Sequence, residues 1–231
     1  MTRSSQFRAV PITDLDSPVF GSKKRKRDTG PPPFLQAEEV ERLFKVIKSP
    51  RDRALFRITY HAGLRASEVG VLEMRDYDPR TERMNFRRLK GSRAGIHRLV
   101  REEVKVLRAW LKIRGSGPGC IFPSRKHAPI SRQRLDALMK QYGAAAKIPF
   151  ELCHFHILKH SCATHLLAKG YHVDQVQDWL GHADIRNTMI YAHTTNARRD
   201  EMGETRFPAS PSQLAAADGD PTASTACGRK L

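Results

Sequence analysis

One tyrosine of this chain, Tyr191, has a setting that suggests chemistry on phosphorus. It lies in the stretch 180–195, nine residues after the Leu-Gly-His sequence that ends at His182. A tyrosine hydroxyl can attack phosphorus and form a covalent intermediate. The alternative is that Tyr191 is an ordinary core aromatic, which is what the other tyrosines of the chain mostly resemble.

Metal-free cleavage of a phosphodiester needs cations for the non-bridging oxygens and a proton for the leaving oxygen. Arg65 follows a glycine between two expected helices, where a guanidinium can bind two phosphate oxygens. A surface ion pair with Glu68 is the alternative for Arg65. Lys90 stands at the edge of a basic loop, from which an ammonium can reach a leaving 5′ oxygen or a minor-groove edge. The alternative for Lys90 is a solvated turn lysine.

A group of titratable residues, His156, Lys159 and His160, follows in the sequence His-Ile-Leu-Lys-His. In a helix, spacings of three and four place side chains on one face, so these residues form a compact patch. His182 comes after Gly181 at an expected helix end, where a polar capping contact is the alternative. We expect no metal site, since neither a Cys-x-x-Cys arm nor a glutamate directly after His156 accompanies the His-x-x-x-His spacing. No cofactor is expected either.

The charge of the chain favours a polyanionic partner. The formal net charge is +17 and the isoelectric point is near 10.2, and the excess of basic residues persists within residues 34–200. For such a composition, nucleic acid is the leading partner, and we expect double-stranded DNA. Arginines of the central basic stretch and of a later helix are the candidate DNA-binding residues: Arg87, Arg88, Arg93, Arg98, Arg132 and Arg134.

The sequence predicts no membrane segment, because no apolar run is long enough to cross a bilayer and no apolar stretch follows Met1. The 4 cysteines have no framework spacing, which is typical of reduced thiols. We therefore expect a cytoplasmic protein associated with the nucleoid.

The elements that must position these residues are mostly helices. Apolar side chains at helical spacing predict helices around residues 40–47, 50–62, 104–111, 131–142, 158–169 and 173–180, plus a short helix capped by Ser67. Residues 83–89 and 96–100 read as two strands joined by a glycine-containing hairpin loop. The prediction is a mainly α domain with a small antiparallel sheet.

Domain organisation follows from composition. Residues 1–33 predict a flexible arm with the basic run Lys23–Arg27 and three consecutive prolines. This run has three interpretations: a segment that binds the DNA backbone, a nuclear localisation signal, or a solvated arm without a partner. Residues 34–202 form the expected catalytic domain, and the small polar residues of 203–231 predict a disordered tail.

The order of the candidate residues resembles that of the tyrosine recombinase (phage integrase) family. The resemblance rests on Gly-Leu-Arg-x-Ser-Glu, His-x-Leu-Lys-His-Ser-x-Ala-Thr-His-Leu-Leu, Leu-Gly-His and Thr-x-x-Tyr, which occur in family order between about residues 34 and 195. It implies a helical catalytic domain with a small sheet that recombines or integrates DNA at specific sites, usually as a tetramer on two DNA sites, with neither metal nor ATP.

The resemblance also implies a role for each residue. Tyr191 would form a 3′-phosphotyrosyl link and free a 5′ hydroxyl, while Arg65 and residue 159 hold the non-bridging oxygens. Lys90 would protonate the leaving oxygen. His156 would assist as acid or base, and His182 would hydrogen-bond the phosphate.

Two departures from the family pattern matter. The family has arginine where this chain has Lys159, and a lysine keeps the charge without the bidentate fork. Loss of one such donor costs on the order of 100- to 1,000-fold in rate, so replacing Lys159 by arginine should raise cleavage. The short arm cannot supply the family's helical core-binding domain, although short members exist, such as the fimbrial phase-switch recombinases. An accessory DNA-bending protein can replace the missing clamp. Two alternatives stay open: a weak or inactive DNA-binding relative, and a type IB topoisomerase.

Overall fold

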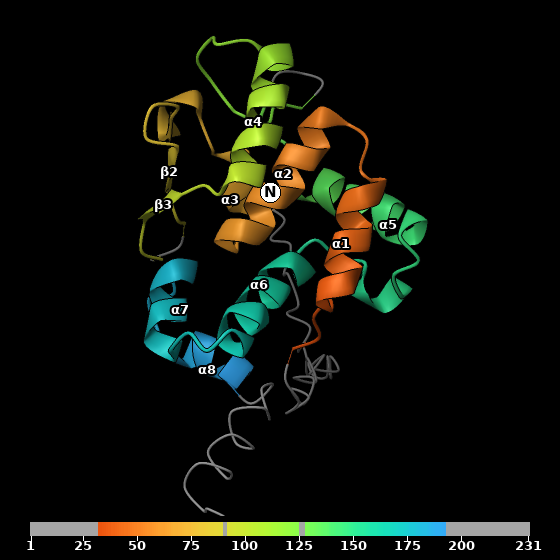
Figure 1. Ribbon diagram of the computed structural model, residues 1–231, viewed down its shortest axis with the longest axis vertical. Helices are drawn as coiled ribbons and strands as arrows, with labels where there is room; N and C mark the ends of the chain where they lie inside the picture. Colours follow the sequence, from red (N-terminus) through yellow and green to blue (C-terminus); the bar gives the residue numbers. More distant parts are fainter. Residues whose placement is uncertain (1–31, 90–91, 125–127, 193–231) are drawn as a thin grey trace, which may run out of the picture. The chain divides into compact units, whose positions relative to one another are not determined.

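The computed structural model describes residues 32–89, 92–124 and 128–192, and its arrangement is shown in Figure 1. Four predicted parts lie outside the described residues: residues 1–31 of the expected arm, Lys90, residues 193–202 and the expected tail. The helices are α1 (Ala37–Val46), α2 (Pro50–Ala62), α3 (Ala66–Gly70), α4 (Arg101–Arg114), α5 (Arg132–Ala145), α6 (Ile157–Ala168), α7 (Val173–Leu180) and α8 (Arg186–Ala192). Two 3-10 turns, Met74–Asp76 and Phe150–Leu152, complete the helical part.

A small antiparallel sheet lies beside α4 in Figure 1. Its strands are β1 (Tyr77–Asp78), β2 (Arg83–Phe86) and β3 (Gly95–Arg98), in the order β1-β2-β3. Tyr77 pairs with Met84, and Phe86 pairs with Gly95. The predicted fold class, mainly helical with a small antiparallel sheet, is therefore confirmed.

Helix α2 is the centre of the core and packs against α4 and α6. Leu55, Phe56 and Ile58 on this helix are fully buried, and each such side chain contributes about 2 kcal/mol through burial. The helix starts as the sequence predicts, with the Ser49 hydroxyl accepting a hydrogen bond from the Asp52 backbone N–H at 3.4 Å and Pro50 in the first turn.

Two glycines end the helices that border the site. Gly63 closes α2 with φ +57° and Gly181 closes α7 with φ +65°, in the left-handed region that glycine adopts without strain. A Cβ at Gly63 would collide with the side chain of Leu180, and one at Gly181 would collide with the backbone oxygen of Arg93. The ends of α2 and α7 and the hairpin loop therefore meet closely.

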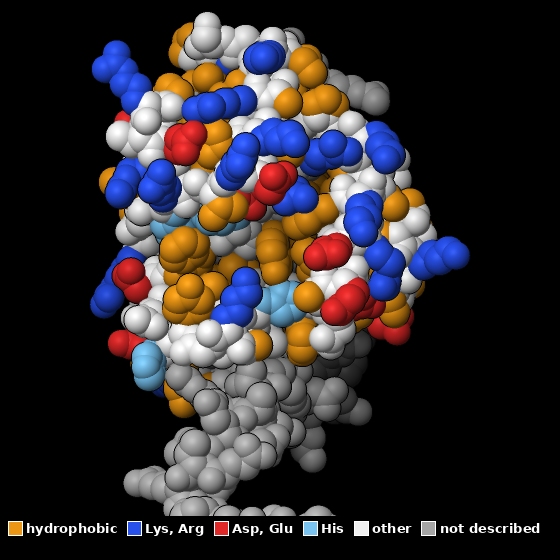
Figure 2. All heavy atoms as spheres, viewed as in Figure 1, with side chains coloured by type: hydrophobic (Ala, Val, Ile, Leu, Met, Phe, Trp, Pro, Cys, Tyr) orange, Lys and Arg blue, Asp and Glu red, His pale blue; other side chains and the backbone are white. Residues whose placement is uncertain are grey.

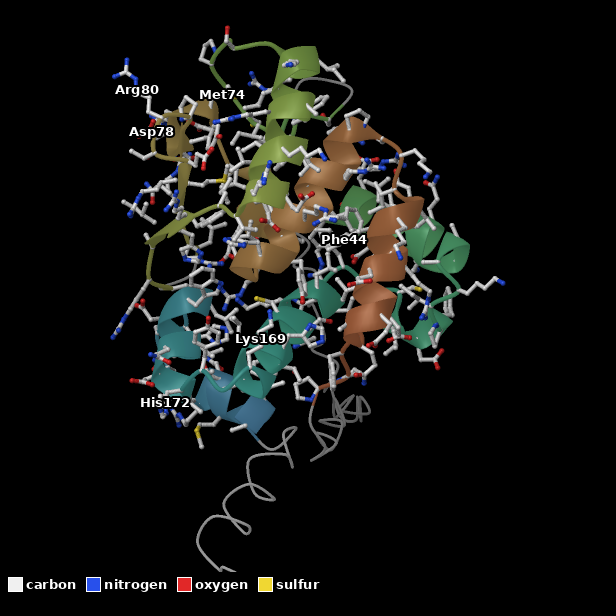
Figure 3. All side chains as sticks on the ribbon, viewed as in Figure 1. Phe44, Met74, Asp78, Arg80, Lys169 and His172 are labelled. Atoms are coloured by element: carbon white, nitrogen blue, oxygen red, sulfur yellow. The ribbon has the colours of Figure 1, made fainter. Side chains whose placement is uncertain are left out.

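The last three helices form a unit with its own small core. Figure 3 labels Lys169 at the end of α6 and His172 at the start of α7, on either side of the turn that brings α7 back against α6. Helix α8 packs against both. Their apolar side chains, with Tyr191 among them, form one cluster with Cys162, Leu167 and Leu180.

Some boundaries differ from those predicted. The short helix α3 starts after Arg65, not at Ser67, because the carboxylate of Glu68 accepts a hydrogen bond from the Arg65 backbone N–H at 2.9 Å. Strand β2 ends at Phe86 instead of residue 89, because Arg87 and Arg88 make contacts outside the ladder. Strand β1 and helix α8 were missed.

None of the helices within the described ranges is both long and apolar enough to cross a membrane.

A buried histidine, His97, and a partly buried one, His61, join the sheet to the helices. His97 on β3 is 6% exposed, and its ring lies 4.1 Å from that of Trp179 on α7, centroid to centroid. Burial, with the charge of Arg88 and the neighbouring His61, lowers the pKa of His97 to about 3. Burial likewise lowers the pKa of His61. Both rings are therefore neutral in the folded protein at neutral pH.

We predict that His97 makes the fold sensitive to acid. Its folded pKa is lower than its unfolded pKa, so the stabilisation is complete above about pH 6.5 and declines as pH falls. Between pH 6.5 and 5 this histidine alone should cost about 2 kcal/mol. Urea unfolding at both values should show a smaller loss for His97→Leu than for the wild type. Equal losses in the two proteins would contradict this account.

Candidate active site

A buried carboxylate organises the cations around the start of α3. Glu68 is fully buried, and its carboxylate accepts hydrogen bonds from Arg65 Nη1 at 2.9 Å and from Arg88 Nη1 at 3.1 Å. Although burial raises it, the backbone N–H of Arg65 and the charges of Arg88 and Lys159 hold the pKa of Glu68 below its ordinary value. Arg65 Nη1 also donates to Ser92 Oγ at 2.8 Å.

Arg65 forms the ion pair with Glu68 that was the alternative to phosphate binding, and its geometry leaves phosphate binding a prediction. The ion pair with Glu68 exists, and it fixes one side of the guanidinium. The side chain is still 31% exposed, and it follows the glycine turn that ends α2. A guanidinium held in this way presents its remaining donors in a fixed direction, as phosphate binding requires.

Arg88 corrects one of the DNA-binding predictions. Its side chain is 1% exposed, and Nη2 donates to the carbonyl oxygens of Ala62 at 2.7 Å and Trp179 at 3.0 Å. Together with the ion pair to Glu68, these bonds tie the ends of α2 and α7 together. The guanidinium of Arg88 is therefore buried beneath the site, where it stabilises the structure and cannot contact a DNA backbone.

Lys159 on α6 lies in the same interior. It is 1% exposed, and Nζ donates to the carbonyl oxygens of Gly63 at 2.8 Å and Leu180 at 3.3 Å. Burial, with the charges of Arg88 and Arg65, lowers the pKa of Lys159 to about 7. This lysine therefore joins the two glycine turns and is close to losing its proton at neutral pH.

Three histidines of the α6 region stack near its beginning. The rings of His156 and His160 lie edge to face with centroids 4.6 Å apart, and those of His154 and His160 are 6.4 Å apart. His156 is exposed on one side of its ring. Burial of the other side, with the charges of Lys159 and Arg65, lowers the pKa of His156 to about 4. The predicted patch of His156, Lys159 and His160 is present, although Lys159 is buried beneath it.

His182 and Tyr191 complete the set from α7 and α8. His182 is 3% exposed, and its Nδ1 forms a hydrogen bond of 2.9 Å with Thr188 Oγ1. Burial, with the charges of Lys159 and Arg65, lowers the pKa of His182 to about 3. The capping alternative for His182 is also met, since its backbone N–H donates to the Gln177 oxygen at 3.0 Å.

Tyr191 is 2% exposed and packs in the α6–α8 cluster, as the core-aromatic alternative required. Its hydroxyl nevertheless forms a 2.9 Å hydrogen bond with Nδ1 of His160. Burial, with the nearby Cys162, raises the pKa of Tyr191, while the charge of Arg65 lowers it. The hydroxyl of Tyr191 is thus within the electrostatic reach of Arg65.

The side chains of the other arginines predicted to bind DNA differ in their exposure to solvent. Arg87 is half-exposed and paired with Asp76 at 2.7 Å, whereas Arg93, Arg98, Arg132 and Arg134 are exposed. Arg132 at the start of α5 is near enough to His156 to lower its pKa. Figure 2 shows further Lys and Arg side chains over the region of α2 and α4, so charge alone does not locate the DNA.

The geometry also includes residues that the sequence analysis did not assign to the site. Glu68 entered it only as a surface partner of Arg65, Thr188 appeared only within the Thr-x-x-Tyr motif without a role, and Ser92 carried no local signal. The histidine next to Lys159, His160, was noted as part of a patch without a role. Lys90 lies outside the described residues. Among the described side chains, no group of three or more His, Cys, Asp or Glu is placed to hold a metal ion.

A mainly helical domain with cations and histidines around one tyrosine defines the class of enzymes that break and rejoin DNA through that tyrosine. Comparison with known sequences agrees: the phage integrase family matches residues 33–198. The type 1 fimbriae regulatory protein FimB of Escherichia coli K12 is 35% identical over 184 residues, covering 76% of this chain and 91% of FimB. The tyrosine recombinase XerC of Erythrobacter litoralis is 34% identical over 188 residues, covering 78% of this chain and 61% of XerC.

Solved structures give the same result. The XerA recombinase matches with a TM-score of 0.67 and 26% identity over 80% of this chain and 67% of that one. The XerH site-specific recombinase bound to its difH substrate matches with a TM-score of 0.65 and 26% identity over 75% of this chain and 54% of that one. The chain therefore belongs to the phage integrase family of tyrosine recombinases. It is a site-specific recombinase, and the topoisomerase alternative is not favoured.

Arg88 and Arg98 should behave differently when replaced by alanine. Arg88→Ala removes one half of a buried ion pair and should lower the free energy of unfolding by about 3–5 kcal/mol, as measured by urea denaturation. Arg98→Ala changes an exposed side chain and should cost less than about 0.5 kcal/mol while weakening DNA binding in a gel-shift assay. Similar stability losses in the two variants would contradict the assignment of Arg88 to the interior.

Proposed function

We propose that the chain recombines specific DNA sites by metal-free transesterification at Tyr191. The observation that supports this most strongly is that Lys159 donates to the Gly63 oxygen at 2.8 Å and the Leu180 oxygen at 3.3 Å, and so joins the two turns that precede Arg65 and His182. The hydroxyl of Tyr191 bonds to His160, the neighbour of Lys159 on α6. Each of these side chains carries a charge or proton suited to a phosphodiester, and they surround the end of α2.

The proposed reaction assigns one task to each group. The Tyr191 oxygen attacks the scissile phosphorus, the bond to the 5′ oxygen breaks, and a 3′-phosphotyrosyl link forms. Arg65 and Lys159 neutralise the non-bridging oxygens, and His182 donates a hydrogen bond to one of them. Lys90 supplies the proton to the leaving 5′ oxygen, assisted by His156. Attack by a 5′ hydroxyl of another strand reverses the step and exchanges strands.

The exposed arginines hold the DNA backbone in this proposal. Arg93, Arg98, Arg132 and Arg134 are free of the interior network and can neutralise phosphates, while Arg87 contributes from its pair with Asp76. We further propose a homotetramer on paired sites, with an accessory DNA-bending protein, acting on nucleoid DNA in the cytoplasm.

The covalent step is tested with nicked suicide duplexes that carry a cognate site taken from the repeats beside the gene. The wild type should form a DNA adduct that survives denaturant, and Tyr191→Phe should form none. Tyr171→Phe alters an exposed tyrosine at the turn before α7 and should cleave like the wild type. No adduct from the wild type on a verified site would mean a weak or inactive relative. An adduct from Tyr191→Phe would show that another residue is the nucleophile.

Lys159 predicts a distinctive pH dependence. With a pKa of about 7, its charge is present below that pH and is lost as pH rises, whereas arginine keeps its charge throughout. Lys159→Arg should therefore cleave faster than the wild type at neutral pH, and its advantage should grow about tenfold or more between pH 6 and 9. Single-turnover rates at subsaturating DNA measure the free enzyme. A ratio that does not change with pH would contradict this role.

A further inference from the structure

The hydroxyl of the proposed nucleophile has a hydrogen-bond partner that none of the assigned roles includes. His160 Nδ1 lies 2.9 Å from the Tyr191 oxygen, and the two ring centroids are 5.7 Å apart. His160 stands on α6 and Tyr191 on α8, two helices that pack together. The contact thus reaches the atom that must lose a proton when the oxygen attacks phosphorus.

We propose that His160, rather than His156, is the catalytic base that takes the proton of Tyr191 during cleavage. This inference rests on the proposed function of Tyr191 as the nucleophile. It divides the histidines of α6 by position: His160 contacts the nucleophile, while His156 presents an exposed edge at the start of the helix. His156 is thereby available to the leaving-oxygen side of the reaction.

The surroundings of His160 keep its ring neutral, which leaves one ring nitrogen with a lone pair for the Tyr191 hydroxyl, but they also make this histidine a weak base until DNA binds. Burial, with the positive character of His156, His154 and Lys159 on its own side of the site, lowers the pKa of His160 to about 3. On the neighbouring helix α8, Tyr191 faces His160, and Arg65, just before α3, acts electrostatically on the Tyr191 hydroxyl. For Nδ1 to accept from the tyrosine O–H, the ring proton must stand on Nε2. An arriving phosphodiester adds negative charge, which favours the imidazolium form of His160.

The step balances in protons and bonds. As the Tyr191 oxygen forms its bond to phosphorus, its proton moves to His160 Nδ1, and the bond from phosphorus to the 5′ oxygen breaks. The leaving oxygen takes its proton from the separate acid of the site. On rejoining, the incoming 5′ hydroxyl gives its proton back to that acid as its oxygen bonds to phosphorus, the bond from phosphorus to the tyrosine oxygen breaks, and His160 returns its proton to Tyr191. Nothing is oxidised or reduced.

Three variants test this role. His160→Ala removes the base, and His160→Gln keeps a polar side chain that can hydrogen-bond but cannot accept a full proton at neutral pH. His154→Ala is the matched control, because it removes a partly buried histidine that stacks near His160. Thermal unfolding and gel-shift binding of the cognate duplex show which variants remain folded and bind DNA.

The expected result is a loss of cleavage on the order of 100- to 10,000-fold for both His160 variants at neutral pH, with His154→Ala near the wild type. Compared with the wild type at the same pH, the His160 variants should recover as pH rises, because hydroxide in solution can remove the proton of Tyr191 when the base is missing. The comparison with the wild type cancels the loss of the Lys159 charge, which affects every variant alike. A 5′-bridging phosphorothiolate duplex has a leaving group that needs no proton. It should restore variants of the general acid but not the His160 variants.

Several outcomes would overturn the proposal. Cleavage by His160→Ala within about twofold of the wild type, or restoration by the phosphorothiolate, would exclude a base. Wild-type rates in His160→Gln alongside slow His160→Ala would show positioning alone. If His160→Ala does not fold, the pH profile and phosphorothiolate response of His160→Gln decide the question. Absence of any adduct from the wild type would instead refute the proposed function itself, so the two failures are distinguishable.

Discussion

The site depends on an excess of buried positive charge around one carboxylate. Arg65, Arg88 and Lys159 converge where the ends of α2 and α7 meet. Glu68 forms ion pairs with the two arginines, whereas Lys159 donates to backbone carbonyl oxygens. Burying unmatched charge is costly, and the structure offsets that cost with backbone carbonyl oxygens and by lowering the pKa of Lys159. In the proposed reaction, a phosphodiester brings the negative charge that this arrangement lacks.

The same cations also stabilise the fold, so substitutions of these residues should affect both the stability of the protein and the proposed reaction. Arg88 and Lys159 donate to carbonyl oxygens at the two glycine turns, and those turns position Arg65 and His182. The glycines are required because a Cβ at either place would collide with the opposite element. A change in one turn should therefore disturb both packing and the phosphate site.

The sequence predicted the convergence of Arg65, Lys159, His182 and Tyr191 because the order of motifs resembles a known family. It also predicted the helical core, since apolar spacing and caps such as Ser49 are local signals. It could not separate Arg87 from Arg88, because two adjacent arginines look alike until tertiary packing buries one of them. Helix α8 was missed because its short sequence has few apolar positions on one face, and it is stabilised by packing on α6 and α7. The partner of the Tyr191 hydroxyl likewise depends on tertiary contact between distant segments.

The buried position of Tyr191 agrees with the core-aromatic interpretation of its ring, and its role as the nucleophile stays a proposal. The ring is a core aromatic of the α6–α8 cluster, and its hydroxyl faces a histidine at the edge of the cation site. The most direct test is to digest the trapped DNA adduct and sequence the DNA-linked peptide by tandem mass spectrometry. The account predicts a nucleotide joined through its 3′ phosphate to Tyr191. A link to any other residue would contradict it.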